Sequence, residues 1–356
     1  MTTMTRKFDI SNPFGAVWGA SGVQGFFGEG YPFHSILKRF CPGFLLRISF
    51  VAKTATLDSR PGNMPLSGIT PTERLPKCVW ASHRKGIALN AVGLSNPGLE
   101  ALLLGKFKGV PQTWQERDKP FQISIMSTAQ TSEARLRETK DMLGLIGRCA
   151  TDFQSEFGIQ INISCPNVSM SHRSNEDTVN ETLATLDLAK DSAPGIRIIV
   201  KLSPTFPPES VHQISRHPAC WGIVMGNTVP WRSPIPWLLE ESGLQINWDD
   251  LFGKDEKSPL QKRGLTQAGG LSGRPLLPII CEWIQRARGS GVQCHLNGGG
   301  GILHPKDVCR VFDAGADSIS LGSIAFLRPW RLAECITESH LKMLRRFFEH
   351  GHGATD

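Results

Sequence analysis

The chain has 356 residues, of which 40% are hydrophobic and 20% are charged, and this balance is typical of a globular protein that can bury a large core. The formal net charge is +7 and the isoelectric point is about 9.0, yet the sequence has no long block of lysine and arginine like those of nucleic-acid-binding tails. We therefore expect small anions as ligands rather than a nucleic acid.

The nine cysteines indicate a reducing compartment. They are scattered along the chain, and no two of them have the Cys-x-x-Cys spacing of zinc or iron–sulfur sites. The ten histidines form no metal-binding motif either, so we expect no metal site. No apolar run follows the basic residues of segment 1–9, and the apolar stretch 44–52 is interrupted by Arg47 and too short to cross a bilayer. The sequence thus predicts a cytoplasmic protein without membrane insertion.

Short apolar runs alternate with amphipathic helical stretches from about residue 47 to the end of the chain. Such alternation favours a parallel sheet whose strands are joined by crossover helices. Strand-like runs occupy residues 16–19, 48–53, 121–126, 159–163, 196–202, 222–225, 292–296 and 318–321. About eight strands of this kind close into a barrel, so the predicted fold is α/β, a (β/α)8 TIM barrel.

Three of the intervening stretches carry apolar residues on one helical face. These residues are Leu136, Leu143, Ile146 and Ala150 in the first stretch, Val179, Leu183 and Leu186 in the second, and Val308, Val311 and Phe312 in the third. We expect Gly315 to end the third helix.

Two segments interrupt the alternation. Residues 54–90 are predicted as an inserted hairpin, and residues 229–275, rich in Pro, Trp and Gly, as a long loop after the sixth strand. We interpret residues 1–356 as one barrel domain with these two insertions.

Polar residues that stand where an apolar strand ends are candidates for the active site, because barrels build their sites at the carboxyl ends of strands. Lys201 follows the run 196–200, and Lys53 follows the run 48–52. A lysine in such a place leaves the core, pairs with an anion or contacts a ligand. The position of either lysine, taken alone, is explained if its side chain extends from the strand end to solvent. Their occurrence together with the features below indicates a ligand site.

The segment 161–168 places a thiol between two amides at the end of the fourth predicted strand. Cys165 lies between Asn162 and Asn167, and Pro166 fixes the turn. A thiol with a pKa of about 8.5 can act as a general base if it is accessible. Isolated cysteines more often pack as small apolar side chains. The flanking amides and the proline favour a catalytic role.

Two glycine turns follow the last two predicted strands. Asn297-Gly298-Gly299-Gly300-Gly301-Ile302 comes after the seventh strand, and Leu321-Gly322-Ser323 after the eighth. Loops in these places commonly bind phosphate in barrels, because bare glycine backbone lets N–H groups approach an anion. The segment 19–25 is also rich in glycine, but no long helical pattern follows it, and we interpret it as a turn.

From Asn12 to about Arg331 the chain resembles the dihydroorotate dehydrogenase family. The resemblance rests on separate motifs that follow one another in a fixed order. These motifs are Asn12-Pro13-Phe14, Ala20-Ser21-Gly22, Lys53-Thr54-Ala55-Thr56, Arg60-Pro61-Gly62-Asn63, Asn90-Ala91-Val92-Gly93-Leu94, the segment 161–168, Lys201-Leu202-Ser203-Pro204, Asn227-Thr228-Val229, Gly269-Gly270-Leu271-Ser272-Gly273 and the two glycine turns. The resemblance implies FMN-dependent oxidation of dihydroorotate to orotate, a step of pyrimidine biosynthesis.

The resemblance also implies a set of site residues, with FMN across the mouth of the barrel. FMN would be bound by Ala20, Ser21, Lys53, Thr54, Asn162, Lys201, Gly273, Gly300, Gly301, Gly322 and Ser323, of which the last five surround its phosphate. Dihydroorotate would be held by Lys53, Asn90, Gly93, Leu94, Asn162, Asn167, Asn227 and Thr228. By this resemblance Cys165 removes the C5 proton while a hydride leaves C6 for the flavin N5, and Lys201 stabilises the negative charge that reduction creates.

Cysteine at the base position resembles the soluble class of the family, whereas membrane-associated members carry serine there and an N-terminal amphipathic extension. The predicted barrel begins almost at once, at Asn12, which agrees with that class. We expect a homodimer, with fumarate, a quinone or NAD through a partner subunit as the electron acceptor. The segment 169–173 lacks the Pro-Gly common in the family, and the loop 230–264 is longer and richer in tryptophan than expected.

Three other functions stay open on the sequence. A dihydrouracil-type flavin oxidoreductase would share the barrel, the cysteine and the lysine, but the full set of groups for an orotate carboxylate argues against it. An RNA-modifying flavin barrel would need an extra basic domain, for which the chain has little length left. A non-catalytic flavin-binding protein would not need both Cys165 and Lys201.

Overall fold

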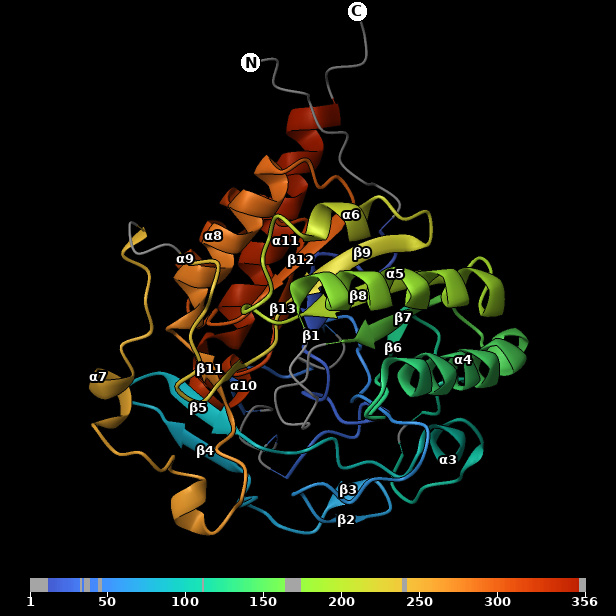
Figure 1. The fold of residues 1–356 in the computed structure, drawn as a ribbon, viewed down its shortest axis with the longest axis horizontal. Coiled ribbons are helices and arrows are strands. Elements are labelled where there is room, and N and C mark those ends of the chain that lie inside the picture. Colours follow the sequence, from blue (N-terminus) through green and yellow to red (C-terminus); the bar gives the residue numbers. More distant parts are fainter. Residues whose placement is uncertain are drawn as a thin grey trace, which may run out of the picture.

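The computed structural model of the protein describes residues 12–32, 34, 39–43, 47–110, 112–163, 174–238 and 242–351. Its centre is a curved sheet of seven parallel strands (Figure 1). In their order across the sheet these strands are β1 (Val17–Gly19), β13 (Ser318–Leu321), β12 (His295–Gly299), β9 (Cys220–Met225), β8 (Arg197–Leu202), β7 (Phe157–Asn162) and β6 (Phe121–Ile125).

The segment 49–55 closes this sheet into a barrel. It forms parallel bridges to β1 through Ser49 and Trp18, and to β6 through Val51 and Gln122. Backbone hydrogen bonds of 2.9 Å link Gly19 N to Ser49 O and Ala52 N to Gln122 O. The predicted (β/α)8 barrel is therefore confirmed, although the second strand pairs only through isolated bridges.

Helices surround the barrel, with α8, α9 and α11 on one side of the strands and α4 and α5 on the other (Figure 1). Outside the second insertion, the helices that lie wholly within the described residues are α3 (Leu99–Leu104), α4 (Ser132–Cys149), α5 (Asn175–Ser192), α6 (Val211–Ser215), α8 (Leu276–Gly289), α9 (Pro305–Asp313), α10 (Ile324–Leu327) and α11 (Leu332–Gly351). Short 3-10 turns occupy Ala150–Asp152, Gln261–Arg263 and Pro329–Arg331. None of the helices in the described part of the chain is long and apolar enough to span a membrane.

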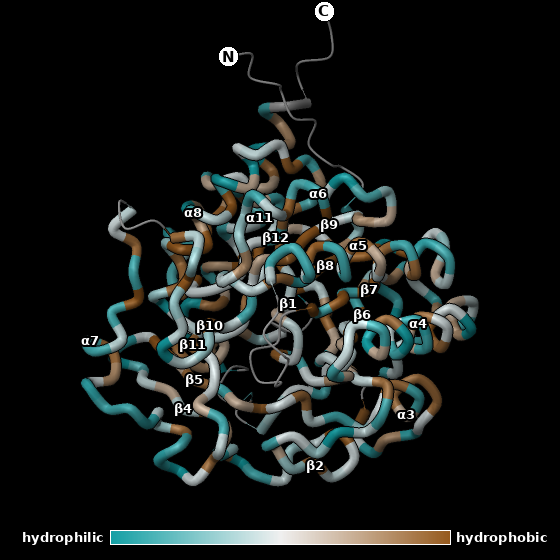
Figure 2. Tube along the Cα trace, in the orientation of Figure 1, coloured by the Kyte–Doolittle hydropathy of each residue, from teal (hydrophilic) through white to brown (hydrophobic). Residues whose placement is uncertain are grey.

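The predicted apolar stripes fall on α4, α5 and α9. Leu143, Ile146, Val179, Leu186, Val308, Val311 and Phe312 are buried. Gly315 follows α9 with a φ of 110°, and its N–H donates to Phe312 O, so it ends this helix as expected. In Figure 2, β8 and β9 are coloured as hydrophobic, whereas α4 and α5 alternate between hydrophilic and hydrophobic turns.

Aromatic rings fill the amino-terminal end of the barrel. His295 stacks on both Trp18 and Trp221, with ring centroids 5.3 and 4.6 Å away, and the two tryptophan rings stack on each other at 6.3 Å. Phe14 packs edge-on against both tryptophans. Because this end is plugged by side chains, ligands can enter only from the carboxyl ends of the strands.

The two insertions join in a second sheet, which the sequence did not predict. Its antiparallel order is β10 (Val229–Pro230), β11 (Gly270–Gly273), β5 (Ile87–Asn90) and β4 (Val79–Ser82). A separate hairpin contains β2 (Leu66–Ser67) and β3 (Thr70–Pro71), and α7 (Trp248–Phe252) lies in the second insertion. The first insertion contains the expected hairpin, formed by β4 and β5. The second is more than the long loop expected, because β11 supplies the partner that the edge of β5 needs.

The seventh barrel strand also lies further along the chain than predicted. It was expected over residues 292–296, with the glycines in a following loop, but β12 includes Asn297, Gly298 and Gly299. A Cβ on Gly298 would lie 2.5 Å from Val311 Cγ1 and 2.8 Å from Ile284 Cδ1, so helices pack directly on this strand. Glycine is used here for close packing.

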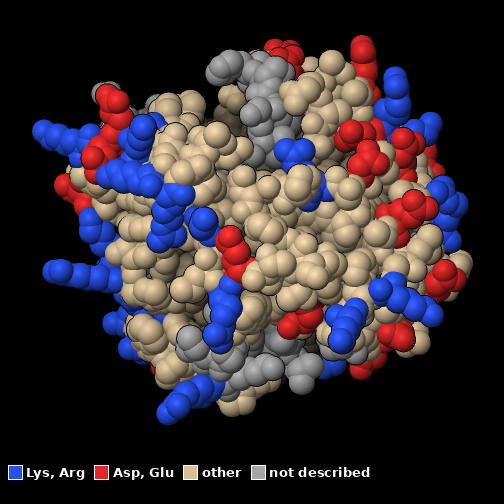
Figure 3. Space-filling model, turned by 90° about the horizontal axis from the view of Figure 1, so that it is seen from below, with Lys and Arg blue, Asp and Glu red and all other residues tan. Residues whose placement is uncertain are grey.

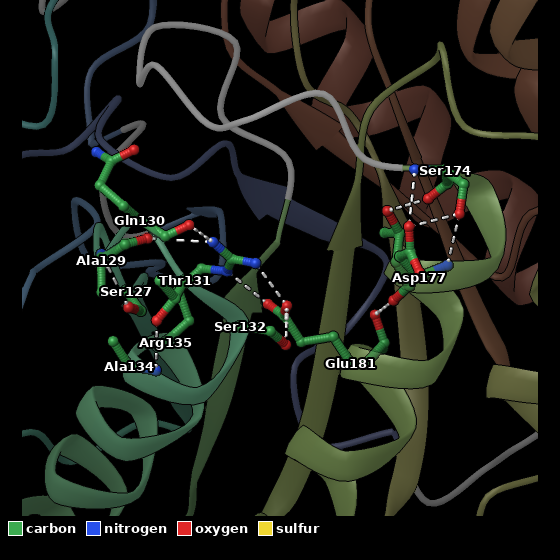
Figure 4. Close-up of polar contacts among 12 residues, drawn as sticks. Ser127, Ala129, Gln130, Thr131, Ser132, Ala134, Arg135, Ser174, Asp177 and Glu181 are labelled. Atoms are coloured by element: carbon green, nitrogen blue, oxygen red, sulfur yellow. Dashed lines mark hydrogen bonds and ion pairs between the residues drawn. The ribbon is translucent and has the colours of Figure 1, made fainter.

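An ion pair joins α4 and α5 at the mouth of the barrel (Figure 4). Arg135 donates from Nε to Glu181 Oε1 at 2.8 Å and from Nη2 to Oε2 at 2.7 Å. Its Nη1 donates to the carbonyls of Ala129 and Gln130, and Ser132 Oγ donates to the same carboxylate at 2.6 Å. Both charged side chains are largely buried, at 7% and 12% exposure. The pair therefore fixes the loop after β6 against α5.

We predict that Glu181→Ala lowers the free energy of unfolding by about 3–5 kcal/mol, because it leaves the Arg135 guanidinium buried without its carboxylate. Glu156→Ala is the matched control, since Glu156 pairs with Arg197 but is 59% exposed, and this variant should lose at most about 1 kcal/mol. Urea unfolding measures both values. Equal small losses in the two variants would contradict the stabilising role of the buried pair.

Candidate active site

Three polar side chains point into the barrel at the carboxyl ends of its strands. On β8, the side chains of Ile198, Val200 and Leu202 point outward into the large hydrophobic core. Ile199 points into the barrel, where it packs with Trp18. Because side chains alternate along a strand, Lys201 also points into the barrel. The same alternation turns Lys53 inward after Val51, and Asn162 inward on β7. These three side chains are 8% or less exposed, and Asn162 is the register partner of Lys201.

Lys53 is enclosed by the turn that follows β1. Its backbone N–H donates to Gly25 O at 2.9 Å, and its Nζ lies 4.7 Å from the centre of the Phe26 ring and donates to Ser95 O. Burial lowers the pKa of Lys53 to about 7, while electrostatic interactions with Cys78 and Glu29 act in the opposite direction. The ammonium is therefore held in a poorly hydrated place where an anion would stabilise it.

Hydroxyl groups connect the turn after β1 with its neighbours. Ser21 Oγ donates to Ala52 O at 2.9 Å and lies 3.0 Å from Thr54 Oγ1. Thr54 in turn lies 2.8 Å from Ser124 Oγ on β6. This chain of contacts fixes Ser21 and Thr54 beside Lys53.

A second group of amides lies beyond Asn162. Asn227 Nδ2 donates to Asn162 Oδ1 at 3.2 Å, and Thr228 N donates to Asn227 Oδ1 at 3.0 Å. Thr228 Oγ1 is buried and has no hydrogen-bond partner among the described residues. A buried hydroxyl without a partner is unfavourable, so this position suits a polar ligand atom.

The predicted glycine turns form a tight cradle. Gly301 has a φ of 79°, and a Cβ there would lie 2.7 Å from Leu277 N in the first turn of α8 and 2.8 Å from Gly273 O. A Cβ on Gly322 would lie 3.0 Å from Ala20 Cβ. Gly300, with a φ of 130°, and Ser323 adjoin these positions. Backbone N–H groups at a helix start favour an anion, so the cradle has the chemistry of a phosphate site.

The remaining expected ligand residues lie on one turn after β5. Asn90 ends β5 and pairs in register with Gly270, while Gly93 and Leu94 both have positive φ, at 70° and 60°. Arg60 Nε donates to Gly93 O at 2.9 Å. The structure thus brings the described candidates to one rim, whereas Cys165 and Asn167 lie outside the described residues.

Several contributors to this rim were missed in the sequence. Ser124 lies on the same inward face of β6 as Gln122, so the alternation in Gln122-Ile123-Ser124-Ile125 could have indicated it. Ser95 directly follows Leu94 and accepts from Lys53. Further along the chain, the side chain of His304 accepts from Lys306 N as the N-cap of α9.

Charge is unevenly distributed around the mouth. Figure 3 shows Lys and Arg gathered toward one side of the face seen from below, and Asp and Glu toward the other. The side of α7 and β4 (Figure 1) exposes Lys85, Lys254, Lys257, Lys262 and Arg263, together with Asp249, Asp250, Asp255 and Glu256.

A closed eight-stranded barrel with buried lysines and amides at its carboxyl rim, and a glycine cradle after its last strands, defines an α/β-barrel enzyme. A family model described as "Dihydroorotate dehydrogenase" matches residues 2–235 of this chain. The chain belongs to the dihydroorotate dehydrogenase family.

Individual relatives extend this comparison over most of the chain. The "Dihydroorotate dehydrogenase B (NAD(+)), catalytic subunit" of Listeria welshimeri is 28% identical over 94% of this chain and 90% of its own length. The protein of the same name from Anoxybacillus flavithermus is 26% identical over 85% of this chain and 81% of its own. A crystal structure of DHODH from Eimeria tenella in complex with ferulenol has a TM-score of 0.57 at 15% identity, covering 94% of this chain and 82% of that chain, and supports the fold alone.

We predict that Lys53→Met changes how stability depends on pH in the ligand-free protein. The folded pKa of about 7 lies below the unfolded value of about 10.4, so between these values only the unfolded chain binds the proton, and the free energy of unfolding rises with pH. The gain in stability of Lys53→Met over the parent should be largest near pH 7 and shrink toward pH 10. Urea unfolding at several pH values measures this difference.

Lys140→Met is the control for this experiment, because Lys140 is exposed on α4. Its curve should stay parallel to that of the parent from pH 7 to pH 10. A parallel curve for Lys53→Met as well would contradict the lowered pKa.

Proposed function

We propose that this protein oxidises dihydroorotate to orotate with FMN as its cofactor. Family membership supports the reaction. The observation that carries the proposal is that Lys53, Asn162 and Lys201 converge on the rim that also holds the glycine cradle. The same rim holds the buried hydroxyl of Thr228, which has no hydrogen-bond partner among the described residues.

The chemistry of the described residues fits FMN. The cradle has room only for backbone at Gly301 and Gly322, which suits a phosphate approached by N–H groups. We assign the phosphate to Gly273, Gly300, Gly301, Gly322 and Ser323. We assign the ring system and ribityl chain to Ala20, Ser21, Lys53, Thr54, Asn162 and Lys201.

The substrate would occupy the space between the amides and the turn after β5. It has two ring carbonyls, two ring N–H groups and a carboxylate, and the rim offers amides, backbone groups and the Lys53 ammonium. We assign it to Lys53, Asn90, Gly93, Leu94, Asn162, Asn167, Asn227 and Thr228. The hydroxyl of Thr228 would gain the partner that it lacks among the described residues.

In this proposal Cys165, in its thiolate form, removes the proton from C5 of dihydroorotate, as the base position of the soluble class of the family implies. When bound, FMN supplies the acceptor for the hydride that leaves C6. Lys201 contributes a fixed positive charge at the mouth, where reduction adds negative charge. Asn162 and Asn227, which bond to each other, orient the pyrimidine.

We further infer that a partner subunit carries the electrons onward to NAD. The bacterial relatives are named as NAD(+)-type catalytic subunits, and this chain aligns with nearly all of one of them. Its scattered cysteines show no iron–sulfur spacing, so the chain itself is not equipped with a cluster for this transfer.

Anaerobic mixing of the purified flavoprotein with dihydroorotate tests the proposal. We predict loss of the flavin absorbance with dihydroorotate and little loss with dihydrouracil. Bleaching by dihydrouracil alone would assign the protein to the dihydrouracil-type oxidoreductases instead.

We predict that in the same assay the flavin of Cys165→Ala stays bound but is reduced at least about 100-fold more slowly, because proton abstraction loses its base. An unchanged rate of reduction would show that Cys165 is not the base.

We predict that Gly301→Ala loses most of its bound FMN, because the added methyl group would meet Leu277 N and Gly273 O in the cradle. Gly264→Ala is the matched control, since Gly264 also has a positive φ, of 90°, but no atom lies within 4 Å of the place that its added methyl group would take. The flavin-to-protein absorbance ratio after purification measures the effect. Full FMN content in Gly301→Ala would contradict the assignment of the phosphate to this cradle.

A further inference from the structure

The turn after β5 adopts a backbone conformation that its sequence does not favour. Leu94 has a φ of 60°, and among the described residues only Arg232 is another non-glycine residue with positive φ. A branched apolar side chain such as leucine rarely occupies this region, in which glycine and asparagine are more common. Something outside Leu94 must therefore hold the turn in place.

The side chain of Asn96 supplies this support with four hydrogen bonds. Nδ2 donates to Leu94 O at 2.7 Å and to Thr56 Oγ1 at 2.8 Å. Oδ1 accepts from Gly98 N at 2.9 Å and from Thr56 N at 3.3 Å. Asn96 is only 3% exposed. Both its amide hydrogens and both its oxygen lone pairs are thus used, and the bonds tie Leu94 to the chain just after Lys53.

Further hydrogen bonds, besides those of the Asn96 side chain, hold this turn, whose residues Gly93 and Ser95 are buried. Arg60 and Asn96 exchange two backbone hydrogen bonds of 2.8 and 2.9 Å, and Arg60 Nε donates to Gly93 O. Both residues also line an open groove of about 450 Å³, together with Pro61 and Pro97. The backbone at Val92 is held separately, by Ser95 Oγ and Asn63 N, whereas the side chain of Asn96 is the one that bonds to Leu94 O.

We propose that Asn96 is a positioning residue for substrate binding. It holds Gly93 and Leu94 in the conformation in which their backbone contacts the substrate, and through Thr56 it sets the distance of this turn from Lys53. The inference rests on the proposed function, because Gly93 and Leu94 are substrate residues there. The inference adds Asn96 to the site as a residue that does not itself contact the substrate.

Asn96→Asp tests this role with little change of shape. The variant keeps the two acceptor bonds but loses both donor bonds, including the one to Leu94 O. We expect the KM for dihydroorotate to rise about tenfold, as for the loss of one buried hydrogen bond, with kcat within about twofold of the parent and full FMN content. At lower pH the new carboxyl group takes up a proton and can donate again, so the KM defect should shrink.

A second variant separates positioning from general stability. Glycine adopts a φ of 60° without strain, so the effect of Asn96→Asp on KM should be smaller in the Leu94→Gly background than in the parent background. An effect of equal size in both backgrounds would overturn the inference. So would an unchanged KM in Asn96→Asp, or a loss of FMN in proportion to the loss of activity.

Asn247→Asp is the control for the same chemical change, because Asn247 is exposed and its side-chain hydrogen bonds go to Asp250 in α7, and it should leave KM unchanged. Hydrogen–deuterium exchange of residues 91–98 without substrate gives a readout that does not depend on the reaction. Exchange there should be faster in Asn96→Asp, and unchanged exchange would overturn the inference. If dihydroorotate fails to reduce the parent flavin, the proposed function fails, while the exchange result still decides the role of Asn96.

Discussion

The bridges of segment 49–55 to β1 and β6 close the barrel, and the rest of the mouth depends on that closure. The segment meets its neighbours through few pairs, such as Trp18 with Ser49 and Val51 with Gln122. Its next residues are Lys53 and Thr54, which contact the turn after β1, strand β6 and the turn after β5. A strand with weak regular pairing is thus held at its end by side-chain contacts, and those contacts belong to the ligand site.

The second sheet connects the two ligand regions of the rim. Strand β5 ends at Asn90, before the turn of Gly93 and Leu94, and its partner β11 ends at Gly273 in the glycine cradle. Because the strands are antiparallel, Asn90 lies opposite Gly270, and Gly273 lies opposite Ile87. One pair of hydrogen-bonded strands therefore sets the spacing between the turn proposed for the substrate and the cradle proposed for the phosphate. The insertions are part of the site and not an addition to it.

The barrel could be predicted from the sequence because its strands are short apolar runs, such as 196–202, whose pattern depends only on local residues. The pairing of β5 with β11 could not be predicted from the sequence. It joins segments about 180 residues apart along the chain, and neither segment has a distinctive pattern. Lys53 and Lys201 stood out because charge at the end of an apolar run is unusual. Asn96 did not stand out in the sequence, because its importance comes from the positive φ of Leu94, which no residue pattern reveals. The role of Cys165 stays a prediction.

In the proposed site, the protonation state of Lys53 and the binding of an anionic ligand depend on each other. Burial of this lysine disfavours the ammonium and lowers its pKa to about 7, so near neutral pH the two protonation states are close in free energy. An anion placed beside it raises that pKa, and by linkage the protonated lysine binds the anion more tightly. A neutral ligand of the same shape gains nothing from this coupling. The desolvated lysine thus acts as a selective element, favouring a carboxylate-bearing pyrimidine over its uncharged analogue.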